Sequence, residues 1–473
     1  MLPMFLAIGD QTIVATALPA IAASLGSVER VSWVVVAYLI ATTVAAPMYG
    51  QLRDSYGGKR MMFVALSVFF GASLLCAVAT SVEMLTLSRV LQGLGGGGLM
   101  TLSQSLIGET VPPRERARYQ GYLAAVMVTS STFGPVAGGY LTEHFGWLSV
   151  FLVNLPLVLV AFALATRLPA RAAPVTGSKH AFDAQGLGFF VAFVVPLLLA
   201  LEIAQRMTLT ALPGALFLVS VSAVAFALLL RREKVAEQPL LPVALLAQPT
   251  IWRSDALAAC HGAVLVSLVT FLPIYLRVRH GTSASETGLV LLPMMFGIGM
   301  GSMLTGRIVS RTGYTAIFPS IGLTTSTVLV TSLALGIGLL SRFWLGFSLF
   351  FMGLFMGTVM GVVQVTVQNA APPSALGRAA ASVQLSRSIG AAIGTALVGA
   401  VLFASLALSD PEAARLFGDL LRNGTRALGN VEGPRLALLQ AELGQAFRAA
   451  FLTIAAFAAI GAVLAWSIPK RRL

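Results

Sequence analysis

The stretch GQLRDSYG at residues 50–57 follows an apolar run, and GRIVSRTG at residues 306–313 repeats its glycine spacing after another apolar run. The same shift of about 260 residues aligns VPPRERAR (111–118) with APPSALGR (371–378). It also aligns STFGPVAGG (131–139) with AAIGTALVG (391–399). Three matches in one register predict that the chain consists of two related halves.

The composition is typical of a membrane protein. Hydrophobic residues make up 57% of the 473-residue chain and charged residues 10%, with a mean hydropathy of +0.87, whereas soluble domains carry about 25% charged residues. A spanning helix needs roughly 20 apolar residues, and only helices or closed barrels satisfy their backbone in lipid. We therefore expect an all-α polytopic membrane protein with fourteen transmembrane helices. Its apolar runs lie near residues 1–24, 31–50, 60–80, 84–108, 119–141, 147–166, 185–204, 208–230, 254–276, 286–306, 315–339, 343–366, 379–406 and 446–467.

The runs divide into two six-helix halves, residues 1–167 and 253–473, with an inserted helix pair and its cytoplasmic linkers at residues 168–252. An extracytoplasmic polar segment of about residues 408–445 contains PEAARLFGDLLRNGTRAL, whose apolar spacing predicts an interfacial helix. A duplicated bundle of this kind places a substrate site near the bilayer midplane, between the halves.

The distribution of Lys and Arg predicts the orientation. One set of alternate loops carries nineteen basic residues and the other set five, and the basic loops of membrane proteins face the cytoplasm. We therefore expect a multi-pass membrane protein with both termini cytoplasmic. The net charge of +13 then reflects topology, and no nucleic-acid partner is expected.

The sequence lacks the features that usually identify several other classes of protein. The chain has no Gly-rich Walker loop and no room for a large soluble domain, so any energy source is an ion gradient. Its four histidines are scattered and Cys76 and Cys260 fall in different halves, so neither an enzyme nor a metal site nor a cofactor is expected. No cleavable signal peptide is evident. The abrupt start at Met1 indicates a very short tail or a preceding segment.

Asp10, in AIGDQTIVATALP (7–19), is the acidic residue deepest in an apolar run, whereas Asp255 is expected in a loop or within about a turn of a helix end. At a rise of about 1.5 Å per residue it lies near the middle of a core about 30 Å thick. A carboxylate there costs at least about 2.5–3.5 kcal/mol and usually faces a cavity or a partner. With a cation nearby to offset burial, such a group can load and unload a proton. The alternative is a structural bond across a helix interface, helped by Thr12 or Thr16.

Two arginines also lie inside apolar runs. Arg89 shares a helix face with Gln92 and several glycines, and Arg387 lies at about mid-depth in its run. Close helix packing explains the glycines but not the arginines. Either arginine can partner a carboxylate or an anionic substrate, and snorkelling to the interface is the alternative.

These motifs together resemble the major facilitator superfamily, and within it the fourteen-span drug:proton antiporter branch. GQLRDSYGGKR (50–60) is similar to the motif between the second and third helices, from which it departs at Ser55 and Gly58. The resemblance implies a gate in which Asp54 engages the start of the thirteenth helix and holds the outward-facing state. The matching positions are Gly50, Asp54, Gly57, Lys59 and Arg60.

Further stretches resemble other motifs of this branch. LSRVLQGLGGG (87–97) resembles the fourth-helix motif, whose arginine, here Arg89, is associated with proton transfer. GYLAAVMVTSSTFGPVAGG (121–139) is similar to the antiporter motif of the fifth helix, where a Pro-Gly face permits the tight contact that prevents a leak. Its matching positions are Gly121, Gly134, Pro135, Gly138 and Gly139. Shorter matches are GDQTIVATALP (9–19), FDAQG (182–186), FLPIYL (271–276) and RSIGAAIG (387–394).

The resemblance implies a monomeric, proton-coupled multidrug exporter of a bacterial cytoplasmic (inner) membrane that works by alternating access. Its partners are lipophilic, cationic drugs or toxic compounds, protons and membrane lipids. Asp10 and Arg89 are expected to couple the proton, and Thr12, Gln92 and Arg387 to lie on the substrate or proton pathway. The alternatives are a dedicated exporter of one endogenous product, such as a lipid, siderophore or antibiotic, and a non-transporting membrane receptor.

Overall fold

The structure is a computed structural model that describes residues 1–26, 30–168, 182–205, 212–241, 243–280, 284–336, 342–410, 417, 433–469 and 472. The all-α prediction is confirmed: in these ranges the regular elements are helices, and the single bridge joins Tyr314 to Arg472. The first part of the chain forms α1 (Leu2–Leu25), α2 (Trp33–Tyr56), α3 (Gly58–Ala77), α4 (Val82–Thr110), α5 (Pro113–Phe145), α6 (Ser149–Leu152) and α7 (Asn154–Thr166). Next come α8 (Ala184–Gln205), α9 (Leu212–Val235) and α10 (Val243–Leu246). The last part forms α11 (Pro249–His280), α12 (Ala284–Thr312), α13 (Ile317–Gly336), α14 (Arg342–Ala370), α15 (Leu376–Ser409) and α17 (Gly433–Trp466), with a short 3-10 turn at Pro373–Ala375.

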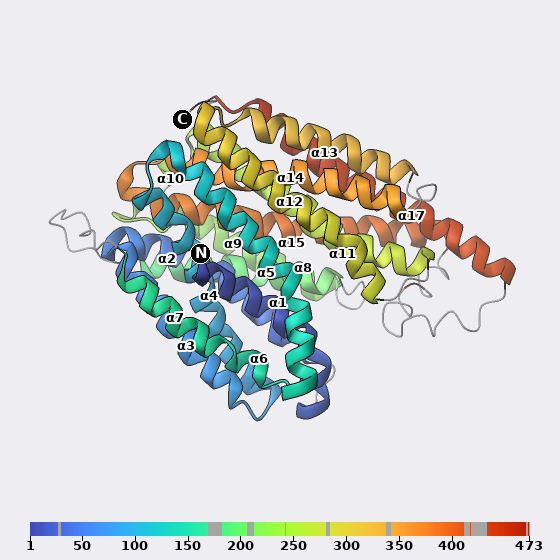
Figure 1. The fold of residues 1–473 in the computed structure, drawn as a ribbon, viewed down its shortest axis with the longest axis horizontal. Helices are drawn as coiled ribbons and strands as arrows, with labels where there is room; N and C mark the ends of the chain where they lie inside the picture. The colour runs from blue at the N-terminus through green and yellow to red at the C-terminus, as the bar shows by residue number, and fades with distance from the viewer. Residues whose placement is uncertain are drawn as a thin grey trace.

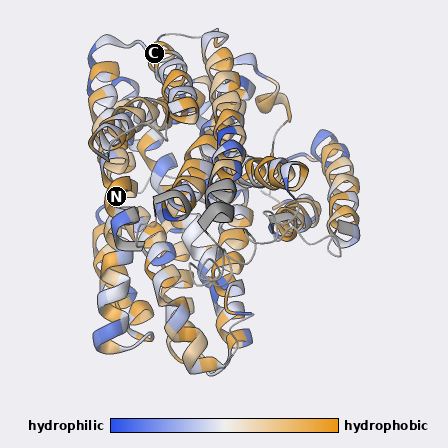
Figure 2. Cartoon of the chain, turned by 90° about the vertical axis from the view of Figure 1, so that its right-hand side faces the viewer, coloured by the Kyte–Doolittle hydropathy of each residue, from blue (hydrophilic) through white to orange (hydrophobic). Residues whose placement is uncertain are grey.

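Each of the fourteen expected apolar runs coincides with a long helix, if α6 and α7 are taken together as one interrupted span. Twelve helices in the described ranges are long and apolar enough to cross a membrane. The other two are α4 and α5, whose polar and glycine residues lower their hydropathy. Large apolar side chains such as Leu87, Val136 and Phe217 are exposed along the helices, as contact with lipid requires. Figure 2 shows hydrophobic residues along most of the length of the helices.

The helices pack in two sets. α4 lies against α2 and α3, and α1 lies against α5; in the other set α12 packs on α14, α11 on α15, and α13 on α17. Figure 1 shows the two sets converging at the left, near α2, α10 and the C-terminus, and diverging toward the right. The contacts of α5 with α12 and of α2 with α15 join the sets.

The sequence repeat marks equivalent points of this interface. Gly57 and Gly313 end α2 and α12 with φ of 89° and 75°, a backbone region that favours glycine. Gly50 and Gly306, seven residues earlier in each helix, are points of close backbone approach. A Cβ atom on Gly50 would lie 2.9 Å from the Gly377 carbonyl oxygen, and one on Gly306 would lie 2.5 Å from that of Ala117. Glycine at both positions therefore lets the two sets touch.

We call the end of the bundle formed by residues 53–60, 111–118, 307–314 and 371–378 the arginine-rich end. In the described part of the chain, every hydrogen bond and ion pair between the two sets lies at this end or within about two turns of it. The structure therefore shows a conformation that is held closed at the arginine-rich end.

The inserted helices α8 and α9 pack on each other, and α8 packs on the seam between α2 and α15. Phe190 and Val194 of α8 share a buried cluster with Val44 of α2 and Leu385 of α15. Asp183 accepts a bond from the Gly186 amide at 2.9 Å and pairs with Arg232 of α9, which accounts for the FDAQG stretch at the start of the pair. The domain boundaries at residues 167 and 253 stay predictions.

The polar segment expected at about 408–445 is shorter than predicted, because α15 extends to Ser409 and α17 already begins at Gly433. The interfacial helix expected at 411–428 lies outside the described residues except for Phe417, which is buried in the large core cluster. Most of the linker at 167–183 also lies outside them.

Candidate functional site

Asp10 lies in the middle of α1 and is completely enclosed. Its Oδ2 atom pairs with the Arg89 guanidinium, and neither side chain has any exposed surface. Its Oδ1 atom accepts hydrogen bonds from Gln92 Nε2 at 2.9 Å and Asn154 Nδ2 at 2.7 Å. One carboxylate thus joins α1, α4 and α7 through charge-assisted hydrogen bonds.

Arg89 of α4 has further partners that hold it in place. Its Nε donates to the Val34 carbonyl at 3.1 Å and its Nη1 to Gln92 Oε1 at 2.6 Å. Its guanidinium carbon lies 4.0 Å from the centre of the Tyr38 ring, a cation–π distance. The side chain is fully buried, with its Nη2 unpartnered among the described residues, so it does not snorkel to the interface.

Glycines of α4 bring the neighbouring helices close to this pair. A Cβ atom on Gly93 would lie 2.6 Å from the Tyr38 carbonyl oxygen of α2, and one on Gly95 would lie 2.7 Å from the Phe69 nitrogen of α3. The glycine run therefore lets α4 pack between two helices, and this packing seals the ion pair from lipid.

Three residues that hold this site were not predicted from the sequence. Asn154 bonds Asp10 directly, Ser73 of α3 accepts from Gln92 Nε2 at 2.9 Å, and Tyr38 donates to the Ala7 carbonyl at 2.7 Å. Asn154 carried a usable signal, because it is the only asparagine before residue 369 and lies in an apolar run. Ser73 and Tyr38 carried none, since such residues are frequent in spanning helices.

Thr12, expected on the pathway, does not contact the Asp10 carboxylate. Its Oγ1 donates to the Gly9 carbonyl at 3.0 Å and lies 3.3 Å from the Ser130 carbonyl of α5. It therefore belongs to the contact between α1 and α5.

The antiporter-motif residues on α5 contact two different helices. A Cβ on Gly134 would overlap the Thr12 hydroxyl of α1, and one on Gly138 would lie 2.6 Å from the Ile13 carbonyl oxygen. Gly121 faces α12 across the interface, where a Cβ would lie 2.7 Å from the Ser302 carbonyl oxygen. A Cβ on Gly139 would meet no described atom within 4 Å, so packing does not require glycine there. Pro135 lies inside α5, beside this face.

Asp54, at the end of α2, caps the first turn of α15. Its Oδ1 accepts from the Gly377 amide at 2.8 Å, and its Oδ2 accepts from the Arg378 amide at 3.1 Å and Nε at 3.2 Å. A carboxylate is favoured at a helix N-terminus, where backbone amides are unpaired. The geometry is that of the implied gate contact, and its gating role stays a prediction.

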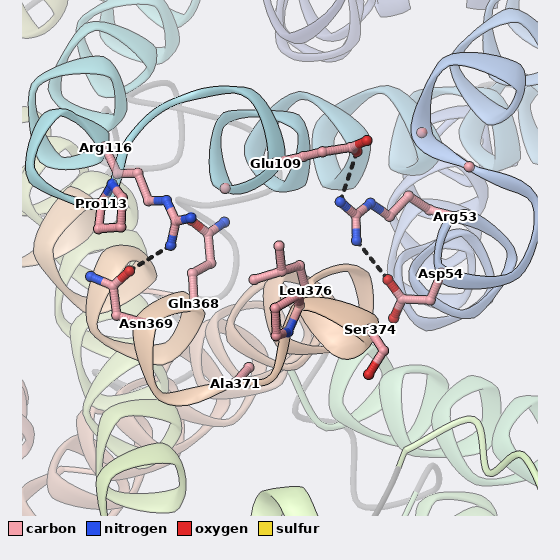
Figure 3. A pocket seen from close by; sticks show the side chains of 14 residues that line it. Arg53, Asp54, Glu109, Pro113, Arg116, Gln368, Asn369, Ala371, Ser374 and Leu376 are labelled. Carbon is pink, nitrogen blue, oxygen red and sulfur yellow. Dashed lines mark hydrogen bonds and ion pairs between the residues drawn. The ribbon is translucent and has the colours of Figure 1, made fainter. Parts of the chain in front are cut away.

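Arg53 is a second cation at this contact, besides Arg378. It donates to Asp54 Oδ1 at 2.7 Å and to Glu109 Oε2 at 2.8 Å, so it ties α2 to the end of α4. Figure 3 shows these bonds on one wall of a cavity of about 440 Å³ at the arginine-rich end, with Arg116 and Asn369 bonded at 2.5 Å on the opposite side. In the sequence, Arg53 is only an extra charge beside the motif, and nothing there indicates these two bonds.

The other basic residues of the motif lie away from the interface. Lys59 Nζ donates to the carbonyl oxygens of Thr166 at 2.6 Å and Leu168 at 2.7 Å, at the end of α7. Arg60 is exposed.

The repeat places Ser310 of α12 at the position equivalent to Asp54 of α2. Of these two equivalent helices, α2 therefore carries a carboxylate cap at this position and α12 does not.

In the described part of the second half, the side chains of one arginine and one aspartate are buried. Arg387 of α15 is 9% exposed and lines a small cavity between the halves, apart from the Asp10 cluster. Asp255 was expected near a helix end, but α11 begins at Pro249, so it lies about 9 Å inside the helix. There it is 7% exposed and accepts from Ser382 Oγ at 3.3 Å.

Both cysteines are free and buried. Among the described residues, no group of three or more His, Cys, Asp or Glu side chains is placed to hold a metal ion.

The fold and the two polar clusters define a duplicated helical membrane protein with a buried ion pair and an inter-half cap. The family model of the Major Facilitator Superfamily matches residues 1–395, and the chain belongs to that superfamily. An uncharacterized MFS-type transporter of Mycobacterium tuberculosis is 35% identical over 66% of this chain and 45% of its own length. In Bacillus subtilis, multidrug resistance protein 3 is 31% identical (64% of this chain, 59% of the relative) and multidrug transporter protein MdtP 32% identical (66% and 57%). The aligned region therefore spans about half the length of these relatives.

Solved structures agree in fold. The proton:xylose symporter XylE superposes with a TM-score of 0.64 over 100% of this chain and 94% of its own, at 13% identity. The human organic anion transporter MFSD10 gives a TM-score of 0.62 over 98% of both chains, at 15% identity.

Proposed function

We propose that the protein is a proton-coupled exporter of lipophilic compounds that works by alternating access, with Asp10 as its proton-binding group. The observation that carries the proposal is the fully enclosed pair of Asp10 and Arg89, held by Gln92 and Asn154 inside the bundle. An ion pair at this depth is costly to build, and ionisable residues in membrane bundles usually serve ion pathways. The relatives named as multidrug transporters support export as the direction of transport.

In this proposal α4 connects the proton site to the cap at the arginine-rich end. Arg89 and Gln92 contact Asp10 near one end of the helix, and Glu109 contacts Arg53 near the other. A proton on Asp10 removes the charge that Arg89 pairs with, so the bonds joining α4 to α1 weaken. Movement of α4 then shifts Arg53, which is bonded to Asp54. Asp54 in turn holds the start of α15. Release of Asp54 opens the arginine-rich end, which the positive-inside rule places in the cytoplasm.

Everted membrane vesicles test the coupling. A respiration-driven pH gradient is followed with a quenched acridine dye while a panel of lipophilic compounds is added. We expect at least one compound to collapse the gradient with the parent protein and none to do so with Asp10→Asn. Glu83→Gln, which removes the exposed partner of Arg30, is the matched control and should behave as the parent does. Gradient collapse by Asp10→Asn equal to that of the parent would refute the role of Asp10.

A further inference from the structure

Arg387 is a buried cation without an acidic partner among the described residues. Its side chain is 9% exposed, its Nε has no hydrogen-bond partner there, and its Nη1 lies 3.5 Å from Gln384 Oε1, a long contact to a neutral group. Buried charges are normally paired, because an unpaired one is expensive to hold away from water. Arg89, the other deep arginine, has an acidic partner, whereas no residue in the described ranges balances the charge of Arg387.

Unused hydrogen-bonding atoms surround the same point. Arg387 lines a cavity between the halves together with Gln104 of α4, Gln120 of α5 and Gln364 of α14. In the part of the chain that the structure describes, Gln364 is 1% exposed with both amide atoms unpartnered, and Gln104 is 3% exposed with its Oε1 unpartnered. Buried polar groups are bonded in the great majority of cases, so unpartnered atoms on two glutamines and an arginine in one cavity indicate a missing ligand.

The remaining lining is apolar and adaptable. Met4 and Met127 come from the first half and Met360 from the second. Methionine side chains are flexible and polarizable, and they accommodate ligands of different shapes. The cavity thus combines one cation, neutral amides and a methionine wall.

We propose that Arg387, with Gln104 and Gln364, binds the acidic group of a lipophilic organic anion, which is the cargo of the exporter. This inference rests on the proposed exporter function and replaces the cationic cargo expected from the sequence. A planar guanidinium binds a carboxylate or sulfonate through two parallel hydrogen bonds, and the amides supply further donors. Asp10 offers no site to a cationic cargo in this conformation, because Arg89, Gln92 and Asn154 occupy its carboxylate.

The size of the cavity fits a conformation in which the two halves are closed around it. Its volume is about 10 Å³, room for roughly one water molecule. The halves meet around it, since a Cβ on Gly361 of α14 would lie 3.3 Å from the Gln120 Cβ. Opening at the arginine-rich end separates these same helices. Cargo therefore enters when that end is open, and closing it displaces the cargo from Arg387.

Three dansyl compounds with one fluorophore and different charges test the cargo class: dansylglycine (anion), dansylamide (neutral) and dansylcadaverine (cation). Binding is measured by fluorescence with the full chain in lipid nanodiscs, without any gradient, so the result does not depend on proton coupling. Binding is measured both in the parent and in an Asp54→Asn background. We expect the arginine-rich end to open in that background, so the closed conformation does not hide Arg387 from the probe. The variants are Arg387→Gln, Arg387→Lys and, as the matched control, Arg118→Gln at the exposed surface of α5.

We expect dansylglycine to bind at least about tenfold more tightly than the other two probes, as a charge-assisted contact implies. Arg387→Gln should abolish this preference and leave dansylamide binding unchanged, Arg387→Lys should retain part of it, and Arg118→Gln should retain all of it. Unchanged dansylamide binding shows that Arg387→Gln is folded.

Tightest binding of dansylcadaverine, or an anion preference that survives Arg387→Gln, would overturn the inference. Either result leaves the exporter proposal standing, because the vesicle assay with Asp10→Asn tests that proposal separately.

Discussion

The residue that organises the first half is Asp10 of α1, because three side chains from α4 and α7 meet at its carboxylate. Arg89, Gln92 and Asn154 donate to its two oxygens, so each oxygen is satisfied. The charge of Asp10 and that of Arg89 are both buried, and each is tolerated only because the other is present. In the proposed mechanism, stability and proton coupling therefore depend on the same pair, and an experiment has to separate them.

A double-mutant cycle separates them. Asp10→Asn leaves the Arg89 charge unpaired, and we expect it to lower the free energy of unfolding by about 3–5 kcal/mol. Arg89→Gln should cost a similar amount. The double variant removes both charges, so most of the loss should be recovered. Thermal unfolding followed by fluorescence-detected size-exclusion chromatography measures the effect; additive losses in the double variant would show that the two residues are not a coupled pair.

The sequence predicted this site in part. Asp10 and Arg89 were identified from their depth in apolar runs and from the resemblance, and the structure brings them together. Asn154 stood out as an isolated amide in an apolar run, but Ser73 and Tyr38 depend on which faces of α3 and α2 turn inward, and a uniformly apolar helix carries no periodicity that reports this. Asp255 was misplaced because α11 begins before its apolar run does, so depth counted from the apolar run was too shallow.

At the scale of elements, glycines set how closely the helices approach. Gly134 and Gly138 let α1 lie on α5, and Gly121 lets α12 lie on the same helix across the interface. The antiporter motif is therefore a packing surface on both sides of α5. Helix positions were predicted well, because each expected run coincides with a helix. The contacts between helices were not predicted from the sequence and are known only from the structure.

Two adjacent glycines of this motif provide a matched test. Gly138→Ala places a Cβ 2.6 Å from the Ile13 carbonyl oxygen, and we expect the resulting overpacking to cost about 1–3 kcal/mol. Gly139→Ala meets no described atom within 4 Å and should leave stability unchanged or raise it by up to about 1 kcal/mol, since alanine favours the helix. The apparent melting temperatures of the two variants check this. Equal destabilisation of both variants would contradict the packing of α1 on α5.

At the scale of the whole molecule, two related sets of helices meet at one end. Gly50 and Gly306 make equivalent backbone contacts, but Asp54 has Ser310 as its counterpart. Its bonds to the start of α15 are charge-assisted, whereas the serine at the equivalent point of α12 carries no charge to strengthen the contact with α5. In the proposed cycle, the Asp54 side of the interface is thus the point at which a change of charge releases the closed state.

Loss of the Asp54 cap should open the arginine-rich end. A single thiol is introduced by Gln364→Cys, at a position 1% exposed between the halves, after Cys76 and Cys260 are replaced by alanine. Asp54→Asn should raise its maleimide labelling rate about tenfold, which corresponds to a shift of about 1.4 kcal/mol toward the open state. Glu83→Gln serves as the control. A labelling rate unchanged by Asp54→Asn would show that Asp54 does not hold the halves together.

Proton-coupled export through Asp10 is tested most directly by uphill transport in reconstituted vesicles. Proteoliposomes receive an imposed pH gradient with the membrane potential clamped, and accumulation of the three dansyl probes is followed over time. The account predicts that the parent accumulates a probe against its gradient. Asp10→Asn should only equilibrate that probe, because it exchanges cargo without using the proton. Accumulation by Asp10→Asn equal to that of the parent would contradict the account.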